Sequence, residues 1–158
     1  MFRRRRTNRQ YAEELAQASP KSVGWSDKIV EVANNIRTNP YWLANLINFE
    51  TAGSWSPSIK NSYGYVGLIQ FGTGAIADLN TAHGTNLTKS ALQAMSAREQ
   101  MDWVEKYFEL PHKRRGFEYS HPMDLYMAVF YPLAMGKPNY QFPASVVGAN
   151  NKIKTPMD

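Results

Sequence analysis

The segment from Asn39 to Glu50 constrains the fold more than any other part of this 158-residue chain. Asn39 can cap a helix, and Pro40 suits its first position, where the missing N–H has no helical partner to lose. Apolar residues then recur at the spacing of one buried helix face, at Leu43, Leu46 and Ile47. The next position on that face is Glu50, so the apolar stripe ends in a carboxylate.

A carboxyl group at the end of an apolar stripe is poorly solvated, which disfavours its charged form and raises its pKa. A general acid that works near neutral pH needs such a raised pKa. Glu50 is therefore the candidate catalytic residue. The alternative is an ordinary Glu that reaches solvent at the end of a helix.

The residues after Glu50 predict a tight loop, because they include small residues, a Trp and a Pro. Gly64 and Gly67 let the backbone approach a ligand closely, and Gln70 offers one acceptor and two donors. Four aromatic residues also occur here, and they serve either sugar stacking or core packing: Trp55, Tyr63, Tyr65 and Phe71. Four others are expected in the core: Trp42, Trp103, Phe108 and Phe130.

Glu50 and the segment Asn-Ser-Tyr-Gly-Tyr-Val-Gly-Leu-Ile-Gln-Phe at 61–71 resemble the soluble lytic transglycosylases and goose-type lysozymes of the lysozyme-like superfamily. In that family a catalytic Glu ends a helix, and a segment Ser-x-x-Gly-Ala-x-Gly-Leu-x-Gln follows. Gly64, Gly67, Leu68 and Gln70 match this segment. Asn61 stands where the family usually has Ser, and Tyr65 stands where it has Ala.

The resemblance covers residues 39–138 and is closest to phage-encoded, virion-associated members of the family. It implies a lysozyme-like fold in which Glu50 is the general acid and base. It implies substrate contacts from Asn61, Tyr65, Gly67, Gln70 and Phe71. It also implies a cleft tyrosine from a later helix, which either Tyr126 or Tyr131 could supply. It implies no cofactor and no metal.

Glycoside cleavage ordinarily uses two carboxyl groups. No second acid stands out, because the remaining candidates lie on predicted helices, where a solvated face or a cap is their ordinary role: Asp78, Glu99, Asp102, Glu105 and Asp124. In lytic transglycosylases one Glu serves as acid and then as base, and the N-acetyl and 6-hydroxyl groups of the sugar replace the second carboxylate and the water.

The resemblance therefore implies a peptidoglycan lytic transglycosylase that cleaves the MurNAc–GlcNAc β-1,4 bond and leaves a 1,6-anhydro product. One alternative is a hydrolytic muramidase, a lysozyme or endolysin, that uses the same Glu50. Another is a catalytically silent glycan-binding module of a virion. The partner expected in each case is the peptidoglycan glycan strand of the bacterial cell wall.

Composition excludes several other classes. Without cysteine the chain has no disulfide framework, no thiol chemistry and no Cys-based zinc site. Its histidines, at positions 83, 112 and 121, lack the spacing of metal ligands. Residues 1–10 contain five arginines and no acid, whereas the remaining 13 Lys and Arg balance 13 Asp and Glu. A body without net charge disfavours nucleic acid as a partner. The run Arg3–Arg6 could bind virion proteins, anionic envelope polymers or nucleic acid, or form a solvated tail.

The chain is expected to lack both a signal peptide and a membrane span. No apolar core follows the basic start, and the longest apolar run, at 126–135, is too short to span a bilayer and contains Pro132. The protein is therefore expected to reach the cell wall through host lysis, injection by a virion or a secretion machine.

The predicted fold is mainly α, a single lysozyme-like domain with a small irregular or β segment next to the helix of Glu50. Residues 1–20 are expected to form a basic, partly helical tail, 21–158 the catalytic domain, and 136–158 its irregular end. Helices are predicted at 11–18, 27–37 (capped by Ser26), 39–50, 75–80, 89–95 (capped by Thr88), 97–110 (opened by Ser96 and Glu99) and 122–131. An extended piece is predicted at 66–71, and an exposed basic loop at 111–120.

Overall fold

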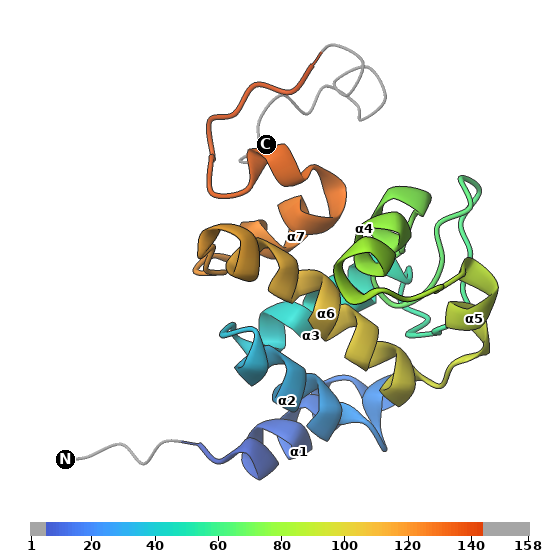
Figure 1. Cartoon of the computed structure of the whole chain (residues 1–158). Helices are drawn as coiled ribbons and strands as arrows, with labels where there is room; N and C mark the ends of the chain where they lie inside the picture. Colours follow the sequence, from blue (N-terminus) through green and yellow to red (C-terminus); the bar gives the residue numbers. More distant parts are fainter. Residues whose placement is uncertain (1–5, 144–158) are drawn as a thin grey trace. The chain divides into compact units, whose positions relative to one another are not determined.

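The computed structural model describes residues 6–143, and this part of the chain is mainly helical, as predicted (Figure 1). Its α-helices are α1 (Asn8–Ala18), α2 (Ser26–Asn35), α3 (Pro40–Glu50), α4 (Thr73–His83), α5 (Lys89–Ala94), α6 (Ala97–Arg115) and α7 (Pro122–Phe130). Two 3₁₀ helices are η1 (Pro20–Ser22) and η2 (Pro132–Ala134). The expectations for Arg3–Arg5 and for 144–158 lie outside the described residues.

The described residues form two compact units, 6–118 and 119–143. The first contains α1 to α6 and the second contains α7 and η2. The boundary expected after residue 20 instead falls inside the first unit, because α1 packs against α2. Leu15 on α1 is 1% exposed. This part of the N-terminal segment is therefore a packed helix.

The core of the first unit is built around α2. This helix packs against α1, α3 and α6, and α6 also contacts α4, so that α6 lies between α2 and α4 (Figure 1). The two apolar faces predicted from periodicity are fully buried: Ile29, Val32, Ala33 and Ile36 on or just after α2, and Leu43, Leu46 and Ile47 on α3. The apolar spacing in the sequence therefore correctly predicted which faces of α2 and α3 are buried in the core.

Most predicted helix caps are also present. The side chain of Asn39 accepts a hydrogen bond from the Tyr41 N–H at 2.8 Å, and Thr88 and Ser96 cap α5 and α6. The cap predicted at Ser26 is wrong, because Ser26 is already inside α2 and buried. None of the helices among the described residues has both the length and the apolar character needed to cross a membrane.

The helix predicted to end at Leu110 continues through Pro111 to Arg115, so a loop beginning at 111 was wrong. Proline removes one helical hydrogen bond, but tertiary contacts hold the last turn in place. Arg37 contacts Glu109 at 3.4 Å and Glu118 at 3.2 Å, which ties this end of α6 to the end of α2. These ion pairs join positions far apart in the sequence, which is why local patterns did not reveal them.

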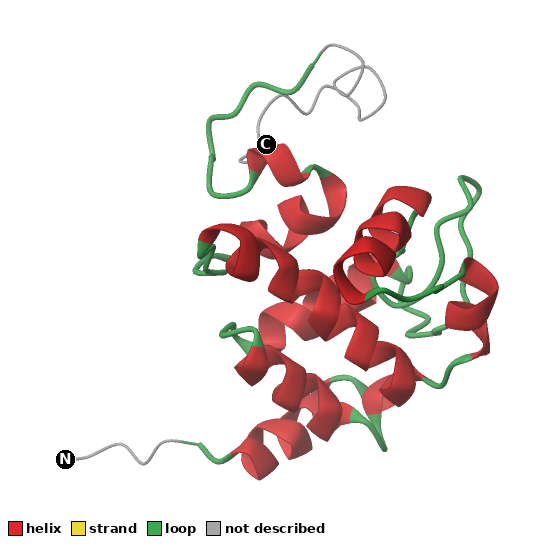
Figure 2. Ribbon diagram, viewed as in Figure 1, coloured by secondary structure: helices red, strands yellow, loops and turns green. Residues whose placement is uncertain are grey.

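The segment between α3 and α4 is irregular (Figure 2). Its regular pairing is limited to isolated antiparallel bridges, Lys60 with Val66 and Val66 with Phe71. The extended piece predicted at 66–71 is wrong. The chain turns back on itself there, because Gly67 and Gln70 have φ values of 85° and 60°. Val66 and Phe71 close the turn with two backbone hydrogen bonds of 3.1 and 2.7 Å.

Candidate active site

Glu50 is the last residue of α3, and its side chain is half-buried. Burial raises the pKa of the Glu50 carboxyl from its ordinary 4.5 to about 7. Among the described residues no hydrogen bond or ion pair engages this carboxyl group. A carboxyl with a pKa near neutrality exists in both protonation states at physiological pH, so it can donate a proton and later accept one.

The loop that leaves Glu50 is strained and firmly held. Ala52 and Trp55 have φ values of 50° and 55°, a region that L-residues rarely adopt. The buried Thr51 hydroxyl donates to a carbonyl one turn earlier in α3 at 2.7 Å and accepts from the Trp55 N–H at 2.9 Å. The Trp55 indole donates to Asn48 at 2.9 Å and packs edge-on against Trp25. Trp55 is 6% exposed, so its role is core packing rather than sugar binding.

Gln100, a fully buried residue of α6, anchors the rest of the segment between α3 and α4. Its side-chain oxygen accepts from the Leu68 N–H at 2.7 Å. Its amide nitrogen donates to the carbonyls of Pro57 at 2.8 Å and Leu92 at 2.9 Å. A Cβ on Gly67 would lie 2.4 Å from that side-chain oxygen. The missing Cβ of Gly67 thus makes room for the Gln100 side chain, which explains a glycine at this position without a ligand.

Two other expected contacts also hold the loop. The Asn61 side-chain oxygen accepts from the N–H groups of Tyr63 at 2.9 Å and Tyr65 at 3.0 Å. The Gln70 amide donates to the Gly67 carbonyl at 3.0 Å. The Tyr63 and Tyr65 side chains are exposed, at 85% and 45%. These two rings are therefore the aromatic surfaces that the segment offers to a sugar.

Phe71, expected to contact substrate, is 1% exposed and cannot present its ring to a sugar. Its ring instead meets the Tyr107 ring edge-on, with centroids 6.2 Å apart. The buried position of this ring follows from the turn at 66–71, which directs Phe71 toward α6.

Tyr107 on α6 is the residue near Glu50 that the sequence analysis missed. Burial, followed by the nearby charges of Asp78 and Glu50, raises the pKa of Tyr107 to about 12. The phenol is therefore protonated at neutral pH, and both carboxyl groups act on it. Gln100, Val104 and Tyr107 follow the i, i+4, i+7 spacing of one helix face, a signal that could have placed them together.

Tyr126 and Tyr131 belong to the second unit, so their position relative to Glu50 is not defined. Tyr131 packs against Tyr140 and Phe142, with centroids 5.8 and 5.4 Å apart. Phe130, expected in the core, is 40% exposed.

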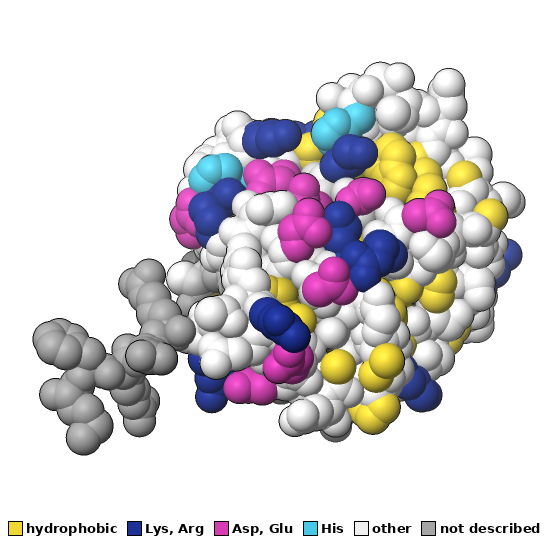
Figure 3. All heavy atoms as spheres, turned by 90° about the horizontal axis from the view of Figure 1, so that it is seen from below, with side chains coloured by type: hydrophobic (Ala, Val, Ile, Leu, Met, Phe, Trp, Pro, Cys, Tyr) yellow, Lys and Arg dark blue, Asp and Glu magenta, His cyan; other side chains and the backbone are white. Residues whose placement is uncertain are grey.

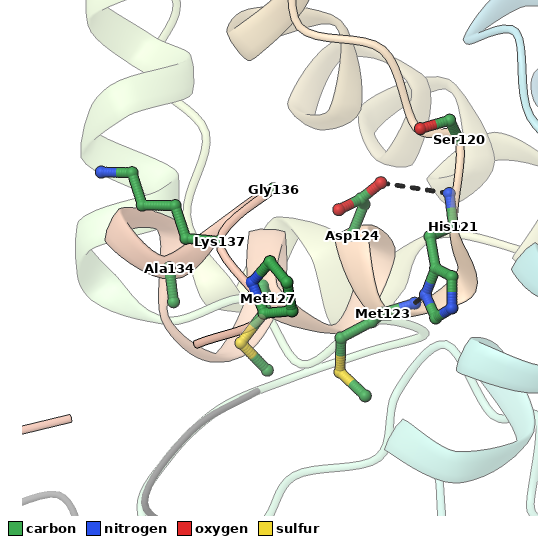
Figure 4. A pocket seen from close by; sticks show the side chains of 9 residues that line it. Ser120, His121, Met123, Asp124, Met127, Ala134, Gly136 and Lys137 are labelled. Atoms are coloured by element: carbon green, nitrogen blue, oxygen red, sulfur yellow. Dashed lines mark hydrogen bonds between the residues drawn. The ribbon is translucent and has the colours of Figure 1, made fainter. Parts of the chain in front are cut away.

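The second unit also contains a pocket of about 370 Å³ beside the start of α7 (Figure 4). The His121 N–H donates to Asp124 at 3.1 Å at its edge, and Met123 and Met127 contribute apolar surface. Neither Tyr126 nor Tyr131 is among the residues that line this pocket.

Charges on the first unit are mostly paired. Basic and acidic side chains lie next to one another on the face drawn in Figure 3. Arg98 contacts Asp27, and Lys28 contacts Asp102, both at 2.8 Å. Of the tail arginines, Arg6 and Arg9 pair with the α1 residues Glu14 and Glu13. Over residues 6–143, no group of His, Asp and Glu side chains has the geometry to hold a metal ion.

Neither a family model, nor a curated protein, nor a solved structure matches this chain. The assignment to the lysozyme-like family consequently rests on the residues from Glu50 to Gln70 and stays a hypothesis.

The raised pKa of Glu50 predicts a pH-dependent stability. Between about pH 4.5 and pH 7 the folded protein binds more protons than the unfolded chain, so its stability falls as pH rises through this range. Glu50→Gln removes the effect. At pH 8 we expect the variant to be more stable than the wild type by on the order of 2 kcal/mol, less than the full shift implies because the side chain is partly solvated. Urea unfolding of both proteins at pH 4, 6 and 8 measures this. A difference that stays constant with pH would contradict the raised pKa.

Proposed function

We propose that this protein is a peptidoglycan lytic transglycosylase that cleaves the MurNAc–GlcNAc β-1,4 bond of glycan strands in the bacterial cell wall. The observation that carries the proposal is the half-buried, unpartnered Glu50 carboxyl, whose pKa burial raises to about 7. It supports a single residue that acts as acid and base in turn. Its place at the end of a helix, before the Gly64–Gln70 segment, agrees with the family resemblance.

In the proposed reaction Glu50 gives its proton to the leaving glycosidic oxygen as the bond from the MurNAc anomeric carbon breaks. The N-acetyl oxygen of the sugar bonds to that carbon and stabilises the charge. The Glu50 carboxylate then takes the proton of the 6-hydroxyl group, whose oxygen displaces the N-acetyl oxygen. Glu50 ends protonated, and the product carries a 1,6-anhydro ring.

A hydrolytic muramidase is the second candidate, and one observation favours it. The charges of Asp78 and Glu50 both act on the Tyr107 phenol. Asp78 is therefore a second carboxyl group near the same phenol as Glu50. Asp78 is exposed and faces Arg114 at 3.6 Å. In a hydrolase, Asp78 would activate water or stabilise the cationic transition state.

Mass spectrometry of the products from purified peptidoglycan separates the two candidates, because anhydro and reducing ends differ by one water. We expect 1,6-anhydromuramoyl ends, and we expect Asp78→Asn to keep most of the activity. Its loss of the Arg114 contact should change stability by no more than about 1 kcal/mol. Reducing ends, together with an Asp78→Asn variant as inactive as Glu50→Gln, would assign the protein as a two-carboxylate hydrolase.

A catalytically silent glycan-binding module of a virion is the remaining candidate class. It predicts that Glu50→Gln keeps every biological activity of the protein. We also propose that the arginine-rich N-terminus binds virion proteins or anionic envelope polymers. The protein would then act on the cell wall after injection by a virion or after host lysis.

A further inference from the structure

Two lysines from different elements, Lys60 in the loop before α4 and Lys89 at the start of α5, meet beside Gly64. A Cβ placed on Gly64 would lie 3.4 Å from Lys89 Nζ and 3.9 Å from Lys60 Cε. Within residues 6–143, neither ammonium group has a hydrogen bond or an ion pair. Both side chains therefore pass beside Gly64, and an anion bound there would relieve the repulsion between their ammonium groups.

The surrounding chain contains almost no compensating charge. Residues 51–97 include a single carboxylate, Asp78. Asp78 is already matched by Arg114 on α6, at 3.6 Å. Lys28, Arg37 and Arg98, in contrast, each contact carboxylates directly. Among the described residues, Lys60 and Lys89 therefore lie close together without the carboxylate contact that Lys28, Arg37 and Arg98 have.

The loop that carries Lys60 is held in one conformation. The Asn61 side-chain oxygen accepts two backbone hydrogen bonds, and the Asn61 N–H donates to the Tyr65 carbonyl at 3.0 Å. The Gln93 amide donates to the Ser58 carbonyl at 3.0 Å, which ties the loop to α5. Both lysine backbones are thus fixed before any ligand binds, which lowers the entropy lost on binding.

Exposed aromatic rings flank the same position. Tyr63 and Tyr65 adjoin Gly64, and the Tyr65 ring packs so closely over Gly72 that a Cβ there would lie 2.4 Å from it. Exposed tyrosine rings offer large, stiff surfaces with a polar tip, which suit a sugar ring. We define the Lys60–Lys89 patch as Lys60, Tyr63, Gly64, Tyr65 and Lys89.

We propose that the Lys60–Lys89 patch binds an anionic oxygen group carried by the glycan strand, a carboxylate of the muramoyl or stem-peptide portion or a phosphate of an attached polymer, beside a sugar ring on Tyr63. The inference rests on the proposed function, because the polymer it names is the strand that Glu50 cleaves. Ammonium groups act as point charges and accept either oxyanion.

The test compares the wild type with a Lys60→Gln/Lys89→Gln double variant. A Lys113→Gln/Lys137→Gln variant removes the same charge from other exposed positions and serves as the control. Retention is measured by sedimentation with three polymers: sacculi that carry phosphate polymers, sacculi stripped of them with hydrofluoric acid, and neutral chitin. We expect the double variant to bind anionic sacculi on the order of tenfold more weakly, with a smaller salt dependence, and to bind chitin as the wild type does.

If the double variant is retained less on both kinds of sacculi, the bound group is the carboxylate. If its retention falls only on sacculi that carry phosphate polymers, the bound group is the phosphate. Retention of the double variant equal to that of the control variant on both sacculi overturns the proposal. So does wild-type binding to chitin as tight as to sacculi. Cleavage of the stripped sacculi is scored separately. Absence of cleavage by the wild type would reject the proposed function, while the retention comparison still decides the patch.

Discussion

Glu50→Gln is expected to fold normally and to lose at least ~100-fold of its glycan-cleaving activity, the usual contribution of a general acid. Glutamine keeps the shape and the hydrogen-bonding tip of the side chain but has no proton to give to the leaving oxygen. Because burial disfavours the charge of Glu50, the variant should be no less stable than the wild type at neutral pH. Clearance of cell-wall suspensions, with circular dichroism as the folding check, measures both effects.

Glu31→Gln provides the matched control. Glu31 is an exposed residue of α2 that pairs with Lys28 at 3.3 Å, so its loss should leave turnover unchanged. If Glu50→Gln clears cell walls at a rate near that of Glu31→Gln, Glu50 is not the general acid. The silent glycan-binding module would then be the better description.

Gln100→Leu is expected to destabilise the protein by about 3–5 kcal/mol, because it removes the hydrogen bonds of three backbone groups to Gln100. The Leu68 N–H and the Pro57 carbonyl lose this partner outright, whereas the Leu92 carbonyl keeps its bond from the Met95 N–H at 3.1 Å. Leucine fills a similar volume, so the loss reports mainly on the hydrogen bonds. Two of the three groups belong to Pro57 and Leu68, in the segment between α3 and α4. Urea unfolding measures the loss, and proteolysis should cut first within 51–72.

Gln93→Leu serves as the control, because the Gln93 side chain is half-exposed and, within residues 6–143, makes one hydrogen bond, to the Ser58 carbonyl. This substitution should lower the free energy of unfolding by no more than about 1 kcal/mol. Equal unfolding midpoints for Gln100→Leu and Gln93→Leu would show that the Gln100 network does not hold the segment that follows Glu50.

The sequence by itself determined the helical class and the position of Glu50. The 3.6-residue spacing of Leu43, Leu46 and Ile47 reports directly on one helix face, and burial of that face places Glu50 at its end. Caps such as Asn39 and Thr88 are equally local, since a side chain there bonds to a backbone group two or three residues away. Such features depend only on neighbours in the chain, so a pattern can reveal them.

Only the tertiary structure decided how the segment after Glu50 is held and which of its side chains are free. From the sequence, Gly67 was expected to let the backbone approach a ligand. In the fold, the side chain of Gln100, more than thirty residues away, fills the space beside Gly67. Phe71 was expected to contact a sugar, but its ring is buried against Tyr107. The close pair of Lys60 and Lys89 likewise exists only because α5 packs beside the loop. Periodicity carries no information about such contacts, because the energies of packing and of buried hydrogen bonds depend on which distant groups the fold brings together.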